Sequence, residues 1–282
     1  MAVVACPACA STDTRDRGRL PLRDGDLTLP EPGRLYACPT CGLYFRHPCP
    51  TSEELERAYV GMPLCDGLPS AERPDYRRAA RLLRTHVPSG SVLDVGCAGG
   101  AFLAGLPSAY ARYGVEPSEE AGAVARQRGV ALLGRSLREA SSSGARFHAI
   151  TLLNVIEHLP SPLEHLAIAA DMLLPGGLLV ISTGNTDALP WRLMRTSYWY
   201  YYPQHVTFYN PKWFRFAARR LDMQCVSVER FCYYGRVLPA MLEKLAKLRA
   251  PRPRSTQGKR PTEPLSTRLW PDHIMVALGK KL

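Results

Sequence analysis

The sequence predicts an α/β fold in which a largely parallel sheet follows a small N-terminal domain built on four cysteines. Four of the nine cysteines form two Cys-x-x-Cys pairs within the first fifty residues. A short apolar run, Val92 to Val95, ends in a glycine-rich loop that leads into a helical pattern. The 282 residues, 46% hydrophobic and 22% charged, suffice for one large domain with an appendage or for two domains.

The cysteine pairs are Cys6 with Cys9 and Cys38 with Cys41. Each spacing places two thiolates on one tight turn, and two such turns supply the four sulfurs of a closed, tetrahedral Zn²⁺ site. Zinc held in this way is structural, and its binding would be coupled to the folding of so small a domain. A redox dithiol is the alternative, but no βαβ pattern surrounds either pair. The other five cysteines are expected as buried thiols in a reducing cytoplasm.

A helix is predicted directly after the second cysteine pair. Thr51 or Ser52 would cap it, the helix would start near Glu53, and Glu54 stands three residues after Thr51, as in a capping box. Residues 51–90 then form a helical connector and cap.

The segment from Ser91 to Leu103 predicts a nucleotide site, because a buried strand, a glycine loop and a helix N-terminus follow one another there. Its pattern, Asp94-x-Gly96-x-Ala98-x-Gly100, differs from the G-x-G-x-x-G that binds a dinucleotide pyrophosphate. An acid before the first glycine would repel a pyrophosphate and attract a cation or an amine. This chemistry suits S-adenosylmethionine.

The same segment resembles motif I of class I S-adenosylmethionine-dependent methyltransferases, with Ala98 at the usual middle glycine. The segments Leu35 to Pro48 and Pro50 to Leu55 are similar to the N-terminal zinc ribbon of certain bacterial members. The resemblance implies a Rossmann-like, seven-stranded methyltransferase sheet preceded by a four-cysteine ribbon. It also implies S-adenosylmethionine as methyl donor and Zn²⁺ as a structural ion.

Further segments follow in the order of this family. Glu116 ends a second strand, where a carboxylate can accept both ribose hydroxyls. A helix over 119–127, strands over 129–134 and 149–154, a loop over 155–160 and a fifth strand ending at Ser182 complete the donor half, 91–184. The implied donor contacts are Asp94, Gly96, Ala98, Gly100, Glu116, Ser136, Leu137 and Asn154.

Two positions depart from the family pattern. Ser136 stands where many relatives have an acid for the adenine amine, so we expect a weaker or backbone-made contact there. His148 follows Phe147 where an aspartate usually opens the fourth strand.

The acceptor half, residues 185–282, begins with an aromatic segment. Of the 24 aromatic residues, 11 lie between Trp191 and Phe216, which indicates either a lid over the donor or a packing cluster. Asn210 is expected to cap a helix that starts at Pro211 and ends near Leu221. Asp222 would then take a left-handed conformation. Two strands, 223–231 and 274–278, would form a C-terminal hairpin, with a helix over 238–248 and a basic insertion over 244–264 between them.

Methyl transfer to a hydroxyl or an acidic carbon needs a general base within hydrogen-bond reach. The candidates are His205, His158 and the tyrosines at 198, 200, 201 and 202, with His205 first because the family places this segment against the acceptor.

The net charge of +11 is unevenly distributed. Residues 192–282 hold 18 basic and 5 acidic side chains, whereas residues 1–191 are nearly neutral. We expect a small-molecule acceptor with an anionic group, such as a sugar, polyketide or other secondary metabolite. An RNA base methyltransferase and a non-catalytic protein of this fold are the alternatives. No apolar run reaches 18 residues, so we expect a cytoplasmic protein without a membrane partner.

Overall fold

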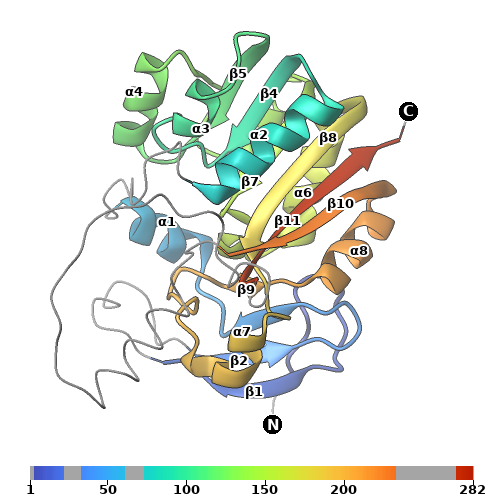
Figure 1. Ribbon diagram of the computed structural model, residues 1–282. Coiled ribbons are helices and arrows are strands. Elements are labelled where there is room, and N and C mark those ends of the chain that lie inside the picture. Colours follow the sequence, from blue (N-terminus) through green and yellow to red (C-terminus); the bar gives the residue numbers. More distant parts are fainter. Residues whose placement is uncertain (1–2, 22–32, 61–72, 233–270, 282) are drawn as a thin grey trace, which may run out of the picture.

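The computed structural model describes residues 3–21, 33–60, 73–232 and 271–281 (Figure 1). The basic insertion 244–264 and the predicted helix 238–248 lie outside these residues. Among the described residues, no helix is long and apolar enough to cross a membrane.

A seven-stranded sheet in the order β10-β11-β8-β7-β4-β5-β6 forms the centre of the molecule. The five strands from β8 to β6 are parallel, whereas β11 runs antiparallel to both β8 and β10. This order confirms the predicted Rossmann-like sheet with a C-terminal hairpin. The strands are β4 (Gly90–Val95), β5 (Tyr110–Val115), β6 (Ala131–Leu132), β7 (Phe147–Leu153), β8 (Leu173–Gly184), β10 (Met223–Phe231) and β11 (His273–Lys280).

Helices cover both faces of this sheet, which is why its central strands are almost wholly apolar. On one face, α2 (Pro74–His86) packs its apolar side against β7 and β8, α3 (Ala101–Ala104) packs against β5, and α4 (Glu119–Gln127) packs against β6. The other face is covered by α5 (Leu137–Ser141), α6 (Pro162–Asp171) and α8 (Pro211–Arg220). The carboxyl ends of the parallel strands remain at one edge, where ligands of such folds bind.

The helix ends follow the predicted local signals. Glu54 N donates to Thr51 Oγ1 at 3.2 Å and Thr51 N donates to Glu54 Oε2 at 2.7 Å, so a capping box starts α1 (Ser52–Val60). Asn210 Oδ1 accepts from Trp213 N at 3.0 Å and caps α8. Asp222, just after α8, has a φ of 50°, the left-handed value expected there.

The N-terminal ribbon forms a second sheet in the order β1-β2-β3-β9. Its last strand, β9 (Thr207–Phe208), comes from the acceptor half and pairs with β3 (Tyr44–His47). The other two are β1 (Arg15–Arg19) and β2 (Arg34–Ala37). The helix α7 (Leu189–Met194) lies beside this sheet (Figure 1), where its Trp191 is buried with Leu35 of β2. The ribbon is therefore joined to the acceptor half through backbone hydrogen bonds.

The aromatic segment lies in a packed cluster. Tyr198, Tyr200 and Tyr201 are buried with Trp191 and Phe208, whereas Tyr202 is exposed. The sequence left two alternatives for this segment, a lid over the donor or a packing cluster, and these three tyrosines belong to a packing cluster. Whether the segment also covers the donor stays a prediction.

Candidate functional site

The predicted donor loop lies at the carboxyl end of β4. Gly96 and Ala98 have φ values of 69° and 46°, so the chain turns through the left-handed region twice in three residues. A Cβ at Gly96 would lie 2.7 Å from Val155 Cγ2, so only glycine lets this loop pass so close to the segment after β7. Gly100 ends the loop with a φ of 73°, at the N-terminus of α3.

Glu116, the first residue after β5, is fixed against this loop. Its Oε2 accepts from Ala98 N at 2.8 Å, and its Oε1 accepts from Ser118 N at 2.9 Å. Burial raises the pKa of the carboxyl group, while the two backbone N–H groups oppose that rise. The structure thus brings together the glycine loop and the carboxylate that was predicted to bind ribose.

Asp94 is a buried acid near the end of β4, just before the loop. Thr151 Oγ1 on β7 donates to Asp94 Oδ1 at 2.5 Å, and burial raises the pKa of Asp94 to about 7. An amine brought to this carboxyl group would favour its ionised form, and a nearby anion would favour its neutral form. The predicted contact of Asp94 with a cationic donor stays a prediction.

A contact that sequence reasoning missed lies beside Asn154, just after β7. Asn154 has a φ of 59° and its Nδ2 donates to Asp75 Oδ2 at 2.9 Å. Asp75 is fully buried at the start of α2 and forms a 2.7 Å salt bridge with Arg73. Charges of both residues act on Asp94. Their only sequence signal was an acid after a proline, which also describes an ordinary helix start.

Ser136 and Leu137 begin α5. Ser136 Oγ accepts from Glu139 N at 3.1 Å as the N-cap, and the Leu137 side chain is buried. The Ser136 hydroxyl caps the helix. The expected weaker or backbone-made contact with the adenine stays a prediction.

A second group of polar side chains lies just beyond β7, on the 3₁₀ helix η1 (Ile156–His158) and the segment before β9. Each of Glu157, His158 and His205 offers one ligand atom, and these atoms lie within 4.8 Å of one another. The two imidazole rings meet edge to face with centroids 4.7 Å apart. The structure therefore brings together the two histidines nominated as bases and adds Glu157, which sequence reasoning did not single out.

Hydrogen bonds fix this group from several sides. Tyr200 Oη donates to Glu157 Oε1 at 2.6 Å and Thr183 Oγ1 donates to Glu157 Oε2 at 2.8 Å. His205 Nδ1 lies 2.8 Å from the Tyr200 carbonyl oxygen, and His158 Nδ1 lies 3.2 Å from that of Gln204. A carbonyl oxygen only accepts, so each of these two Nδ1 atoms carries a proton. The backbone of Asn154 is a second hydrogen-bond partner of the His158 ring. Burial lowers the pKa of His158 and favours its neutral form.

The four ribbon cysteines form the other cluster of ligand atoms. Cys6 Sγ and Cys41 Sγ are 3.6 Å apart, Cys9 Sγ and Cys38 Sγ are 3.5 Å apart, and all four lie within 4.8 Å of one another. Sulfurs bound tetrahedrally at the usual Zn–S distance are about 3.8 Å apart. The donor set and its spacing therefore fit a closed zinc site.

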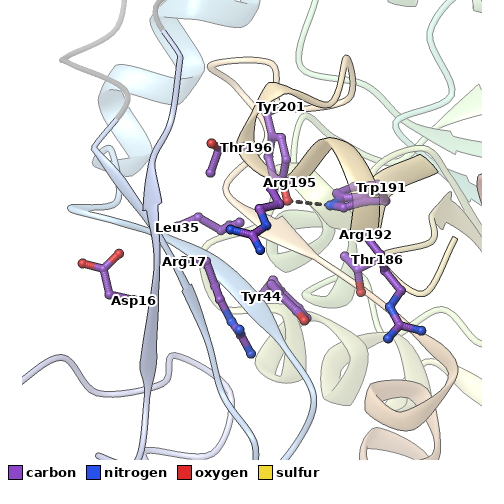
Figure 2. A pocket seen from close by; sticks show the side chains of 10 residues that line it. All are labelled: Asp16, Arg17, Leu35, Tyr44, Thr186, Trp191, Arg192, Arg195, Thr196 and Tyr201. Atoms are coloured by element: carbon purple, nitrogen blue, oxygen red, sulfur yellow. Dashed lines mark hydrogen bonds between the residues drawn. The ribbon is translucent and has the colours of Figure 1, made fainter. Parts of the chain in front are cut away.

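A cavity of about 370 Å³ lies between the ribbon and α7. Figure 2 shows Arg17 and Tyr44 extending into it from the ribbon strands, and Arg192 and Arg195 from α7 and η2 (Arg195–Ser197). One wall is Trp191, whose Nε1 donates to Tyr201 Oη at 2.5 Å. The three arginines outnumber the single acid, Asp16, so the cavity favours an anion.

Comparisons with known proteins agree with this geometry. A family model described as a methyltransferase domain matches residues 72–228, more than half of the chain. Ubiquinone biosynthesis O-methyltransferases of Azoarcus sp. and Xanthomonas campestris are both 34% identical, over 104 and 125 residues. These matches cover 34% and 40% of this chain and 45% and 49% of the relatives. The chain thus spans about half the length of the curated relatives it matches.

Solved structures show the same fold at low identity. An S-adenosylmethionine-dependent methyltransferase of Thermotoga maritima is 18% identical with a TM-score of 0.50, over 73% of this chain and 89% of that one. The plantazolicin methyltransferase, solved with S-adenosylhomocysteine and a substrate analogue, is 18% identical with a TM-score of 0.53, over 82% and 98%.

Fold and site together define an S-adenosylmethionine-dependent class I methyltransferase. The chain belongs to the methyltransferase domain family, as its sequence motifs predicted.

Proposed function

We propose that this methyltransferase transfers its methyl group to a hydroxyl oxygen of a small-molecule acceptor, such as a sugar, polyketide or other secondary metabolite. The observation that supports this proposal is the group of Glu157, His158 and His205 at the carboxyl edge of the sheet, in which Glu157 and His205 are buried and His158 is partly exposed. A hydroxyl must lose its proton as its oxygen attacks the methyl carbon, and an imidazole lone pair can take that proton. His205 stays the first candidate base, followed by His158.

The relatives support an oxygen acceptor. The curated proteins that match this chain are named ubiquinone biosynthesis O-methyltransferases, although the match covers about half of their length. An O-methyltransferase needs the donor and a proton acceptor at one edge of the sheet, and in this chain Asn154 of the donor half is three residues before Glu157.

The residues proposed to hold S-adenosylmethionine surround the carboxyl ends of β4, β5 and β7. Glu116 would accept the ribose hydroxyls and Asp94 would meet the amine. The backbone from Gly96 to Gly100 would pass beneath the donor. Ser136 and Leu137 would border the adenine, and Asn154 would border the methionine part.

The acceptor is proposed to have an anionic group, bound by the arginines of the cavity between the ribbon and α7. An arginine fork suits a carboxylate or a phosphate. Trp191 lines this cavity and packs against Tyr200, with ring centroids 5.2 Å apart. Since Tyr200 donates its hydroxyl to Glu157, the cavity lies close to the proposed bases.

The ribbon is proposed to hold a structural Zn²⁺ on Cys6, Cys9, Cys38 and Cys41. The ion would leave no open coordination position, so it would support folding and not the reaction. Mass spectrometry under native conditions should show one zinc per chain, and Cys41→Ser should lose it.

Calorimetry with S-adenosylmethionine, followed by single-turnover assays on a panel of hydroxylated acceptors, tests the proposal. We expect donor binding and a product heavier by one methyl group, with a lower rate for His205→Ala at saturating acceptor. Transfer to an amine or carbon acceptor alone would contradict the O-methyl assignment. A steeply salt-dependent transfer to RNA would favour the RNA alternative. Absence of donor binding would leave only the non-catalytic alternative.

A further inference from the structure

We propose that Arg46, on strand β3 of the ribbon, is a positioning residue for the acceptor site and holds the segment that carries His205. The ribbon then takes part in methyl transfer through one of its own side chains. The contacts of Arg46 are those of the described residues. Its role in the reaction rests on the proposed function, in which His205 is the first candidate base.

The first argument is that Arg46 holds this segment at two points, one before His205 and one after it. Its Nη1 donates to the Pro203 carbonyl oxygen at 2.5 Å, and its backbone N donates to the Val206 carbonyl oxygen at 2.9 Å. The pairing of β3 with β9 continues the contact beyond Val206. One residue of the ribbon therefore places the backbone on both sides of His205.

The second argument is that the same segment is also bound to η1. Val206 N donates to the Glu157 carbonyl oxygen at 2.8 Å, and the Gln204 carbonyl oxygen lies 3.2 Å from His158 Nδ1. The segment thus joins the ribbon to η1. Loss of the ribbon contact would move His205 relative to the other two residues of the group.

The third argument is the burial of a charged side chain. Arg46 is only 2% exposed. Burial of a charge costs free energy, and an apolar side chain of similar volume often gives a fold that is as stable or more stable. Packing alone therefore does not explain an arginine at this place in β3. An oriented donor for the Pro203 carbonyl oxygen does.

The fourth argument is that the ribbon is fixed to the large domain close to Arg46. The strand β3 begins shortly after Cys41. Lys212 on α8 donates through Nζ to the carbonyl oxygen of Pro39, which lies between Cys38 and Cys41, at 2.5 Å. The ribbon therefore provides a fixed frame from which Arg46 can hold the segment.

The position of His205 matters because a general base must lie within hydrogen-bond reach of the acceptor's hydroxyl as the methyl group is transferred. A displacement of about 1 Å can lower the rate about a hundredfold. Arg46 would not touch the reacting atoms and would act only through His205. Its loss should therefore lower kcat and leave donor binding intact.

The experiment compares Arg46→Met with the unaltered chain, both zinc-loaded, on the hydroxylated acceptor that reacts fastest in the panel. Methionine removes the guanidinium group and keeps an unbranched side chain. We expect kcat to fall about tenfold to a hundredfold, while KM for the acceptor and the affinity for S-adenosylmethionine stay unchanged. The control Arg15→Met removes an exposed arginine from β1 of the same ribbon and should leave kcat unchanged.

Arg46→Lys guards against a variant that fails to fold, because lysine keeps the charge and a donor. Its ammonium group is a point charge without the planar fork, so it should hold the Pro203 carbonyl oxygen less firmly. We expect kcat to fall only about threefold to tenfold in this variant. A purely structural arginine would lower the urea midpoint of unfolding in both variants and leave kcat per folded chain unchanged, and that result would overturn the proposal.

A second measurement does not depend on activity. Nuclear magnetic resonance of the chain with isotope-labelled histidine resolves the ring nitrogens, and His205→Gln assigns the signals of His205. Arg46→Met should shift these signals, whereas those of His148, near the start of β7, should stay in place. Unchanged His205 signals in Arg46→Met would overturn the proposal.

The two measurements separate this inference from the proposed function. If the unaltered chain methylates a hydroxylated acceptor and Arg46→Met does so at the full rate, the inference fails and the proposed function stands. If no hydroxylated acceptor is methylated but the His205 signals shift in Arg46→Met, the proposed function fails and the placement of His205 by Arg46 stands.

Discussion

The carboxylate of Glu116 accepts a hydrogen bond from the backbone N–H of Ala98 at 2.8 Å, and so joins the end of β5 to the glycine loop after β4. Its other oxygen accepts from Ser118 N. Both oxygens thus face backbone donors, and each retains a second lone pair that can accept from a ribose hydroxyl. The carboxylate would therefore fix the loop and bind the donor at once.

Glu116→Gln should weaken S-adenosylmethionine binding about tenfold to a hundredfold. The amide group of glutamine must place its NH₂ against one of two backbone N–H donors, and it loses charge-assisted bonds. Calorimetry measures the change. Glu119→Gln, an exposed position on the same turn, is the matched control and should bind the donor as the unaltered chain does.

Donor affinity should rise with pH up to about 7. Burial raises the pKa of Asp94 to about 7 from an ordinary value near 4, so the free protein holds this carboxyl group protonated in the intervening range. The cationic amine of the donor binds best to the ionised form, and binding below pH 7 should release a proton. Calorimetry in buffers of different ionisation enthalpy counts the protons released.

The same shift has a consequence for stability without donor. The folded state binds a proton that the unfolded chain has lost between about pH 4 and 7, so this group's contribution to stability falls as pH rises through that range. Asp94→Asn should remove both effects. A donor affinity that depends on pH equally in Asp94→Asn and the unaltered chain would assign the titration to another group.

Arg192→Ala and Arg195→Ala should each raise KM for an anionic acceptor about fivefold, equivalent to about 1 kcal/mol, because both guanidinium groups are exposed to solvent. Added salt should reduce the difference. Arg219→Ala, which removes an exposed charge on α8 away from the cavity, should leave KM unchanged. An equal effect in all three variants would indicate general steering by net charge.

Local signals were enough to predict the capping box at Thr51 and the left-handed residue at Asp222, whereas the order of the strands in the sheet was implied by the resemblance to the methyltransferase family. Those two signals depend on residues within a few positions of one another, as does the glycine loop. The pairing of β9 with the ribbon was not predictable, because Thr207 and Phe45 are distant in sequence and neither has a distinctive pattern. The same applies to Asp75 beside Asn154 and to Tyr200 beside Glu157. Polar contacts between distant segments leave no periodicity in either segment.

Asn210 joins the ribbon to the core and offers a direct measure of that junction. Its Oδ1 caps α8 through Trp213 N, while its Nδ2 donates to the carbonyl oxygen of Gly42 at 3.0 Å. Gly42 directly follows the second cysteine pair, so this one side chain connects the turn that bears Cys41 to a helix of the large domain. The residue is only 6% exposed, so water cannot easily replace either bond.

Asn210→Ala should lower the free energy of unfolding by about 2–4 kcal/mol, since it removes a cap and leaves buried polar groups unpaired. Asn210→Ser retains the capping oxygen but is too short to reach Gly42, so it should recover only about 1 kcal/mol. Ser118→Ala, which removes the cap of α4 alone, gives the cost of a cap without the junction. Urea denaturation of the zinc-loaded chain measures the free energy of unfolding of all three variants. If Asn210→Ala lowers this free energy no more than Ser118→Ala does, the junction contributes nothing to stability.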